Sequence, residues 1–112
     1  MRLLHESFIK HEDIRAAISF NSKVYRFAYY LEAMKMNDIR LIGYDLLQEN
    51  INYLKSGYIS CLLAQRPEKQ AYFTVRDMCS KLVLKQQVNK INYMPIDIIM
   101  KENIDDYVNF NE

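Results

Sequence analysis

Hydrophobic residues along the chain alternate between short apolar runs and stretches with helical spacing. Two runs, residues 16–20 (AAISF) and 39–43 (IRLIG), are too short for helices and predict strands. A third run, residues 59–64 (ISCLLA), is apolar at most positions, as expected for a strand in a parallel sheet that helices cover on both faces. Polar residues follow each run, so the pattern predicts three strands that each lead into a turn.

Between these runs, apolar side chains recur at intervals of three and four, which is typical of amphipathic helices. The first helix is expected to start at Asn21 and Ser22, which suit the N-cap position. The second should stop at Gly57, and the third should begin with Pro67 in its first turn and reach about Lys85. The three apolar stripes are Val24, Phe27, Ala28, Leu31 and Met34; Leu47, Ile51 and Leu54; and Ala71, Val75, Met78 and Leu82.

The last part of the chain predicts one more strand and one more helix. Met94, Ile96 and Ile98 alternate with other residues, and Pro95 restricts this strand to a sheet edge or to its own first residues. Residues 104–110 predict a short final helix. Alternating strands and helices with short connections imply parallel strands joined by right-handed crossovers. We therefore predict an α/β fold, a three-layer parallel sheet with flanking helices.

Composition and charge narrow the class of protein. The chain has 112 residues, of which 50% are hydrophobic and 26% charged, which predicts one soluble globular domain over residues 1–112. The net charge of +1 without a basic run argues against direct DNA binding by this chain alone. No apolar stretch approaches the roughly 18 residues of a membrane span, and the first residues do not resemble a signal peptide. We expect a cytoplasmic protein with no membrane partner.

Motifs that would indicate catalysis or a metal site are missing from the sequence. Cys61 and Cys79 have no CxxC or His/Cys spacing, which predicts buried reduced thiols and no metal. No nucleotide-binding glycine motif and no nucleophile elbow occur, and His5 and His11 lie among charged residues, where we expect them to be exposed. The sequence therefore predicts neither an enzyme nor a cofactor.

Three polar residues follow the predicted strands: Asn21, Asp45 and Gln65. In open α/β sheets, ligands collect at the carboxyl ends of the strands. Taken singly, Asn21 and Asp45 can be helix caps and Gln65 a polar turn residue before a proline. Taken together, two amides and a carboxylate offer donors and acceptors that suit a polyhydroxylated ligand, and a sugar is the natural candidate.

The same region carries a resemblance to a known family. Its most specific elements are Gly43-Tyr44-Asp45 at a strand end and Ala64-Gln65 before a helix, within matching stretches at residues 20–32, 40–72 and 92–107. Over these stretches the chain resembles the C-terminal half of the effector domain of lactose-repressor (LacI/GalR) family transcription regulators, particularly those of Bacteroides-like bacteria. Bacterial sugar-binding proteins of the type I periplasmic-binding fold look similar here.

The resemblance implies a partial type I periplasmic-binding-protein-like (Rossmann-like) subdomain, the C-terminal fragment of a LacI-type effector-binding domain without the DNA-binding headpiece and first lobe. It implies that Asp45, Gln65 and Asn21 hydrogen-bond the hydroxyls of a monosaccharide or oligosaccharide effector. It also implies an open edge at strand 16–20 and a helix after Pro67 that lacks its partner, so we expect a homo-oligomer.

Two alternatives to a sugar-binding portion of a regulator stay open. The chain can be a stand-alone oligomeric interaction module, which its nine tyrosines and five phenylalanines would suit. It can also be a truncated remnant of a regulator that no longer binds a ligand.

Overall fold

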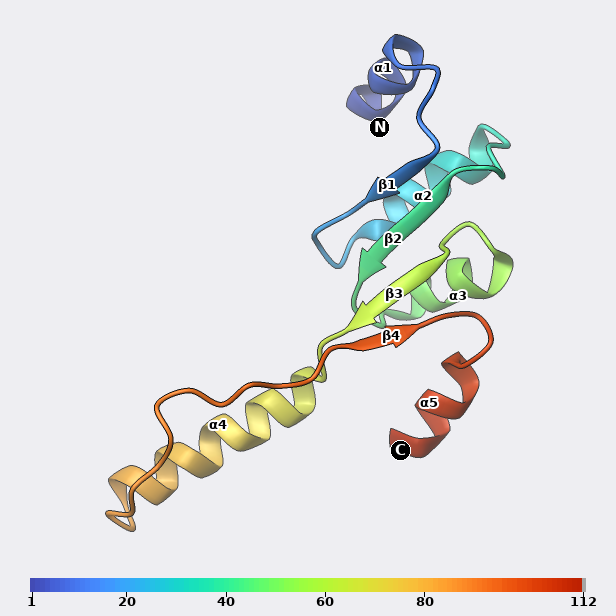
Figure 1. The fold of residues 1–112 in the computed structure, drawn as a ribbon. Helices are drawn as coiled ribbons and strands as arrows, with labels where there is room; N and C mark the ends of the chain where they lie inside the picture. The colour runs from blue at the N-terminus through green and yellow to red at the C-terminus, as the bar shows by residue number, and fades with distance from the viewer. Residues whose placement is uncertain (112) are drawn as a thin grey trace. The chain divides into compact units, whose positions relative to one another are not determined.

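The computed structural model describes residues 1–111 and divides into two compact units (Figure 1). Unit 1 comprises Met1–Ala64 and the chain from Asp97 onward, and it contains the sheet. Unit 2 is Gln65–Ile96 and contains the longest helix, α4, together with an extended segment that follows it. The helices are α1 (Arg2–Lys10), α2 (Val24–Ala33), α3 (Gln48–Ser56), α4 (Pro67–Leu82) and α5 (Ile104–Asn111).

The sheet of unit 1 has four strands in the order β1-β2-β3-β4. The strands are β1 (Ala16–Ile18), β2 (Arg40–Tyr44), β3 (Cys61–Ala64) and β4 (Asp97–Ile99). The first three strands are parallel and overlap the predicted runs. β4 lies at the sheet edge, but it begins at Asp97, so Met94, Pro95 and Ile96 of the predicted strand lie outside it, in the extended segment of unit 2. These elements confirm the α/β class.

The direction of β4 corrects the prediction of an all-parallel sheet, because β4 runs antiparallel to β3. Asp97 pairs with Ala64, so the chain leaves the sheet after Ala64 and re-enters it opposite the same residue. A parallel fourth strand would need a crossover that returns to the other end of the sheet. Hydrophobic spacing carries no information about the end of the sheet at which the chain re-enters it.

The residues at the ends of α3 and α4 are types that favour helix ends. Gly57 caps α3 with a φ of +93°, a left-handed conformation that glycine adopts at little cost. Pro67 occupies the first turn of α4, and Glu68 is in the same turn, where its charge suits the helix dipole. The N-cap of α2 is Lys23, so this helix begins slightly later than the predicted Asn21 and Ser22.

One face of the sheet carries the hydrophobic core of unit 1. Leu41, Leu62 and Ile99 point toward α2 and α3, where Leu31 and Leu54 are also fully buried. Gly43 lies on this face directly against α2, since a Cβ atom built at Gly43 would be 2.4 Å from Cγ1 of Val24. A glycine is therefore what allows α2 to approach β2 this closely.

The opposite face of the sheet is largely open. Ile18 is 54% exposed and Ile98 is 62% exposed, while Ile42, Cys61 and Leu63 are half-buried. The pairing register puts all five side chains on this face, because Ile18 pairs with Ile42, Ile42 with Cys61, and Leu63 with Ile98. Within unit 1, the apolar strands are therefore buried on one face only.

The two cysteines are free thiols in different surroundings. Cys61 is half-buried, and its burial raises the pKa of the thiol. Cys79 is exposed, which makes the prediction of a buried thiol wrong at that position, because α4 has no buried residue. His5 and His11 are exposed as predicted, and Nδ1 of His5 lies 3.2 Å from the hydroxyl oxygen of Tyr30.

Across residues 1–111, no helix has both the length and the apolar character that crossing a bilayer requires.

Replacing Gly43 with alanine should destabilise the protein, because the added methyl group would clash with Val24. Overpacking of this kind costs about 1–3 kcal/mol, which urea unfolding measures. Val24→Ala removes two of the three clashing atoms, Cγ1 and Cγ2, and keeps Cβ, so Gly43→Ala should cost less in a Val24→Ala background than in the wild type, though not nothing. Equal costs in the two backgrounds would show that the close approach is not what requires glycine.

Cys79 should react with a disulfide reagent such as DTNB faster than Cys61 at pH 8. Burial limits access to Cys61 and, by raising its pKa, lowers its thiolate fraction, and the thiolate is the reactive form. The rate for Cys61 should rise as the pH increases toward its pKa. The single variants Cys61→Ser and Cys79→Ser assign the two phases, and equal rates would contradict the burial difference.

Candidate functional site

Two of the three predicted ligand residues lie at strand ends in unit 1. Asp45 follows β2 directly, and Asn21 lies three residues beyond the end of β1. Because β1 and β2 are parallel, their carboxyl ends open at the same edge of the sheet. Gln65 follows β3 directly and is the first residue of unit 2.

The side chain of Asn21 organises the turn before α2. Its Oδ1 accepts a hydrogen bond from the backbone N–H of Lys23 at 2.9 Å, and the hydroxyl of Ser19 lies 3.5 Å from the same oxygen. This is the local bonding that short amide side chains provide at helix starts. The helix-cap interpretation of Asn21 is therefore wrong: the N-cap is Lys23, and Asn21 organises the turn three residues before α2 begins at Val24.

Asp45 has a different local role from the helix cap considered for it. The N-cap of α3 is Leu47, which makes no side-chain capping hydrogen bond. Asp45 is half-buried and has a φ of +70°, the left-handed region that Asp tolerates better than most residues. Its N–H donates to the carbonyl of Leu63 at 3.0 Å. The backbone conformation of this turn is thus fixed against β3.

Asn50 on α3 holds both strand-end turns and is the residue that sequence reasoning missed. Its side chain is fully buried. Oδ1 accepts a hydrogen bond from the N–H of Tyr25 at 3.0 Å, and Nδ2 donates to the carbonyl of Ser22 at 2.8 Å. Nδ2 also lies within bonding distance of the carbonyls of Tyr44 and Asp45, at 3.2 and 3.0 Å. One amide therefore links the start of α2 to the end of β2.

A signal for Asn50 was present in the sequence. Asn50 lies three residues after Leu47 and four before Leu54, so it falls on the apolar stripe of α3. A polar side chain on the buried stripe of a helix needs hydrogen-bond partners, because an unpaired buried amide is costly.

In unit 2, Gln65 lines a cleft of about 360 Å³ between α4 and the extended segment that follows it. The cleft has polar groups from Gln70, Thr74 and Asp77 on the helix and from Asn92 on the segment. Its apolar lining consists of Phe73, Tyr93, Met94, Pro95 and Ile96. The volume and the mixture of amide, carboxylate and aromatic groups would accommodate a small polar molecule.

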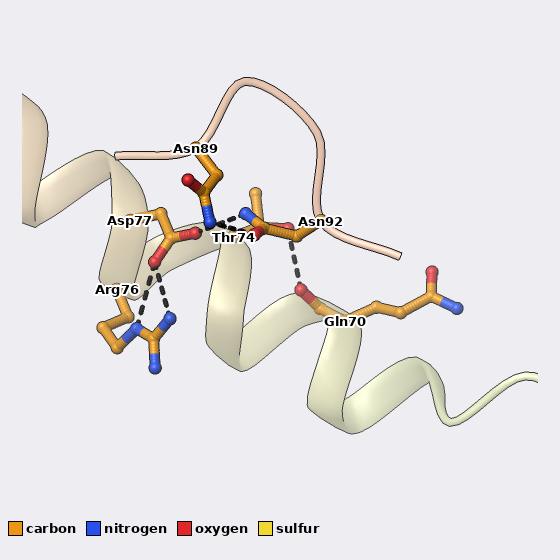
Figure 2. A network of polar contacts seen from close by, with 6 residues as sticks. All are labelled: Gln70, Thr74, Arg76, Asp77, Asn89 and Asn92. Carbon is orange, nitrogen blue, oxygen red and sulfur yellow. Dashed lines mark hydrogen bonds and ion pairs between the residues drawn. The ribbon is translucent and has the colours of Figure 1, made fainter. Parts of the chain in front are cut away.

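The carboxylate in this cleft is already engaged, as Figure 2 shows. Oδ1 of Asp77 accepts hydrogen bonds from Nε and Nη2 of Arg76 at 3.0 and 2.8 Å. Oδ2 accepts from Nδ2 of Asn92 at 2.9 Å, and Nδ2 of Asn89 lies 3.5 Å from Oδ1 of Asn92. Arg76 also stacks on Phe73, 4.7 Å from the ring centre. This network ties the extended segment to α4, which is a structural role.

No group of three His, Cys, Asp or Glu side chains suited to a metal ion occurs in the part of the chain that the structure describes.

Solved structures similar to this chain are binding and regulatory proteins. A protein from Bacteroides fragilis assigned to the LacI transcriptional regulators is 45% identical, with a TM-score of 0.90 over 95% of this chain and 37% of its own. A glucose-galactose binding protein from Geobacillus stearothermophilus is 24% identical, with a TM-score of 0.84 over 92% of this chain and 37% of its own.

A carbohydrate transporter solute-binding protein from Agrobacterium radiobacter, solved with D-arabinose, is 17% identical. Its TM-score is 0.85 over 96% of this chain and 37% of its own. No family model matches the sequence, and no curated protein is similar to it. The chain therefore has a periplasmic-binding-protein-like α/β fold, and it spans about 37% of the length of these three relatives.

Asn50→Ala should lower the free energy of unfolding by about 1–3 kcal/mol, because it leaves buried backbone groups of both strand-end turns without partners. Urea unfolding measures the loss. Asn52→Ala is the matched control on the same helix, since Asn52 is exposed and its amide oxygen accepts from Gln48. A similar loss in the two variants would contradict the linking role of Asn50.

Proposed function

We propose that this chain is the carbohydrate effector-binding portion of a LacI-type transcription regulator and corresponds to a C-terminal part of its effector domain. The observation that carries the proposal is the 45% identity to the B. fragilis regulator over 95% of this chain. A repressor of this kind works in the cytoplasm and has no catalytic role. The near-neutral charge fits a part of the protein that does not itself contact DNA.

Asp45, Gln65 and Asn21 are the residues that we assign to sugar hydroxyls. The fixed left-handed turn at Asp45 supports this assignment, because it holds the carboxylate at the carboxyl end of β2. A carboxylate accepts hydrogen bonds from two neighbouring hydroxyls, and an amide both donates and accepts. Ligands named for the relatives, D-arabinose and tagatose, support a monosaccharide as the effector class.

A second candidate is a stand-alone oligomeric interaction module that no longer binds a ligand. The open face of the sheet in unit 1 favours it, since Ile18 and Ile98 are more than half exposed there. Exposed apolar groups on a sheet face usually mark a surface that another polypeptide covers. Sugar binding separates the two candidates.

The coding sequence upstream of Met1 tests the regulator assignment: it should encode a first lobe and a helix-turn-helix headpiece.

Titration with D-arabinose, D-tagatose, D-galactose and D-glucose, followed by amide chemical shifts, should give saturable shifts for at least one sugar. Asp45→Asn keeps a residue that tolerates a positive φ but removes the charge. It should weaken binding about 10- to 100-fold, since a hydrogen bond to a charged group contributes about 1.5–3 kcal/mol. Gln65→Ala should also weaken it.

The control is Asp38→Asn, which makes the same charge change at an exposed site before the amino end of β2. It should leave the sugar affinity unchanged. Equal affinities of the wild type and Asp45→Asn would remove Asp45 from the site. A wild-type protein that binds none of the sugars would favour the interaction module.

A further inference from the structure

The side chain of Asn50 bonds to both of the turns that carry candidate sugar ligands in unit 1. Its Nδ2 lies 2.8 Å from the carbonyl oxygen of Ser22, which is next to Asn21, and 3.0 Å from the carbonyl oxygen of Asp45 itself. An amide nitrogen carries two hydrogens, so Nδ2 donates to both turns at once. Asn50 is fully buried, so these bonds are shielded from solvent.

The backbone of Asp45 is held on both sides of its Cα atom. Its N–H donates to the carbonyl of Leu63 on β3 at 3.0 Å, and its carbonyl accepts from Asn50 on α3. The φ of +70° between these two groups belongs to a region that few residues with a side chain occupy, and such a conformation persists where surrounding contacts enforce it. Asn50 therefore helps to fix the direction in which the carboxylate leaves the backbone.

The turn of Asn21 is tied to the same side chain at two points. Besides the bond to Ser22, Oδ1 of Asn50 accepts from the N–H of Tyr25 at 3.0 Å. Between these points, Oδ1 of Asn21 accepts from the N–H of Lys23 at 2.9 Å. These bonds connect the turn to α3, which is the element that also holds the turn after β2.

We propose that Asn50 is a positioning residue of the sugar site, which holds Asp45 and Asn21 in one fixed arrangement before a sugar arrives. This inference rests on the proposed function. Asn50 does not touch the sugar, because its side chain is fully buried. Binding groups that are already ordered lose less conformational freedom when a ligand binds, so the link through Asn50 raises the sugar affinity. This effect is separate from the contribution that Asn50 makes to stability.

A titration of the wild-type protein gives a first test that needs no substitution. The probe is whichever of D-arabinose, D-tagatose, D-galactose and D-glucose gives saturable shifts. The side-chain amide protons of Asn50 should shift with the same Kd as the backbone amide of Asp45, although the sugar cannot reach Asn50. The matched control is the side-chain amide of Asn52, which is exposed on the same helix and should not shift. Asn50 resonances that stay in place while the Asp45 amide shifts would contradict the positioning role.

A second test removes the link. At metal sites, residues that orient the ligands contribute about 10- to 100-fold to affinity, and Asn50→Ala should weaken sugar binding by a similar factor. The control is Ile59→Val, which truncates a fully buried side chain before the amino end of β3, at the opposite edge of the sheet from the turns. It lowers stability but should leave the affinity unchanged. Circular dichroism checks that both variants are folded under the conditions of the titration.

A third test asks whether Asn50 acts through Asp45. In an Asp45→Asn background, Asn50→Ala should weaken binding by a smaller factor than in the wild type, because the charged group that Asn50 positions is gone. A general loss of stability would instead lower the affinity by the same factor in both backgrounds.

The outcomes separate this inference from the proposed function. An unchanged affinity of folded Asn50→Ala, or equal factors in the two backgrounds, would overturn the positioning role and leave sugar binding intact. A wild-type protein that binds none of the four sugars would remove the proposed function, and the positioning role with it.

Discussion

The buried side chain of Asn50 joins the start of α2 to the end of β2, and the candidate site of unit 1 depends on this connection. Asn21 and Asp45 are on separate loops, and neither loop is part of a helix or strand. The pairing of β1 with β2 places the starts of the two loops side by side. The buried amide of Asn50 on α3 bonds to both loops, and its burial makes every lost bond costly.

Close packing between α2 and β2 also fixes the position of the first turn of α2. Gly43 leaves no side chain between the strand and Val24, so the first turn of α2 lies directly on the sheet. Val24 neighbours Tyr25, whose N–H bonds to Asn50. The apolar contact and the polar bond therefore fix the same end of α2, next to the turn at Asn21.

The exposed apolar surfaces have a common physical origin. An α/β sheet with apolar side chains on both faces is stable in water when both faces are covered, and unit 1 covers one. Helix α4 in unit 2 likewise bonds to the extended segment through Asp77, while its apolar side chains Val75, Met78 and Leu82 are exposed.

The sequence by itself determined the order and type of the elements from β1 onward, because hydrophobic spacing and end signals act over a few residues, whereas α1 was not predicted. Gly57 at the end of α3, Pro67 at the start of α4, and the three apolar strand runs were all readable in this way. Only the tertiary structure decided the direction of β4, the open face of the sheet and the exposure of Cys79. Spacing shows that a side chain can be buried, but burial depends on what lies opposite it in space. The same holds for Asn50, whose partners lie up to 28 residues away along the chain.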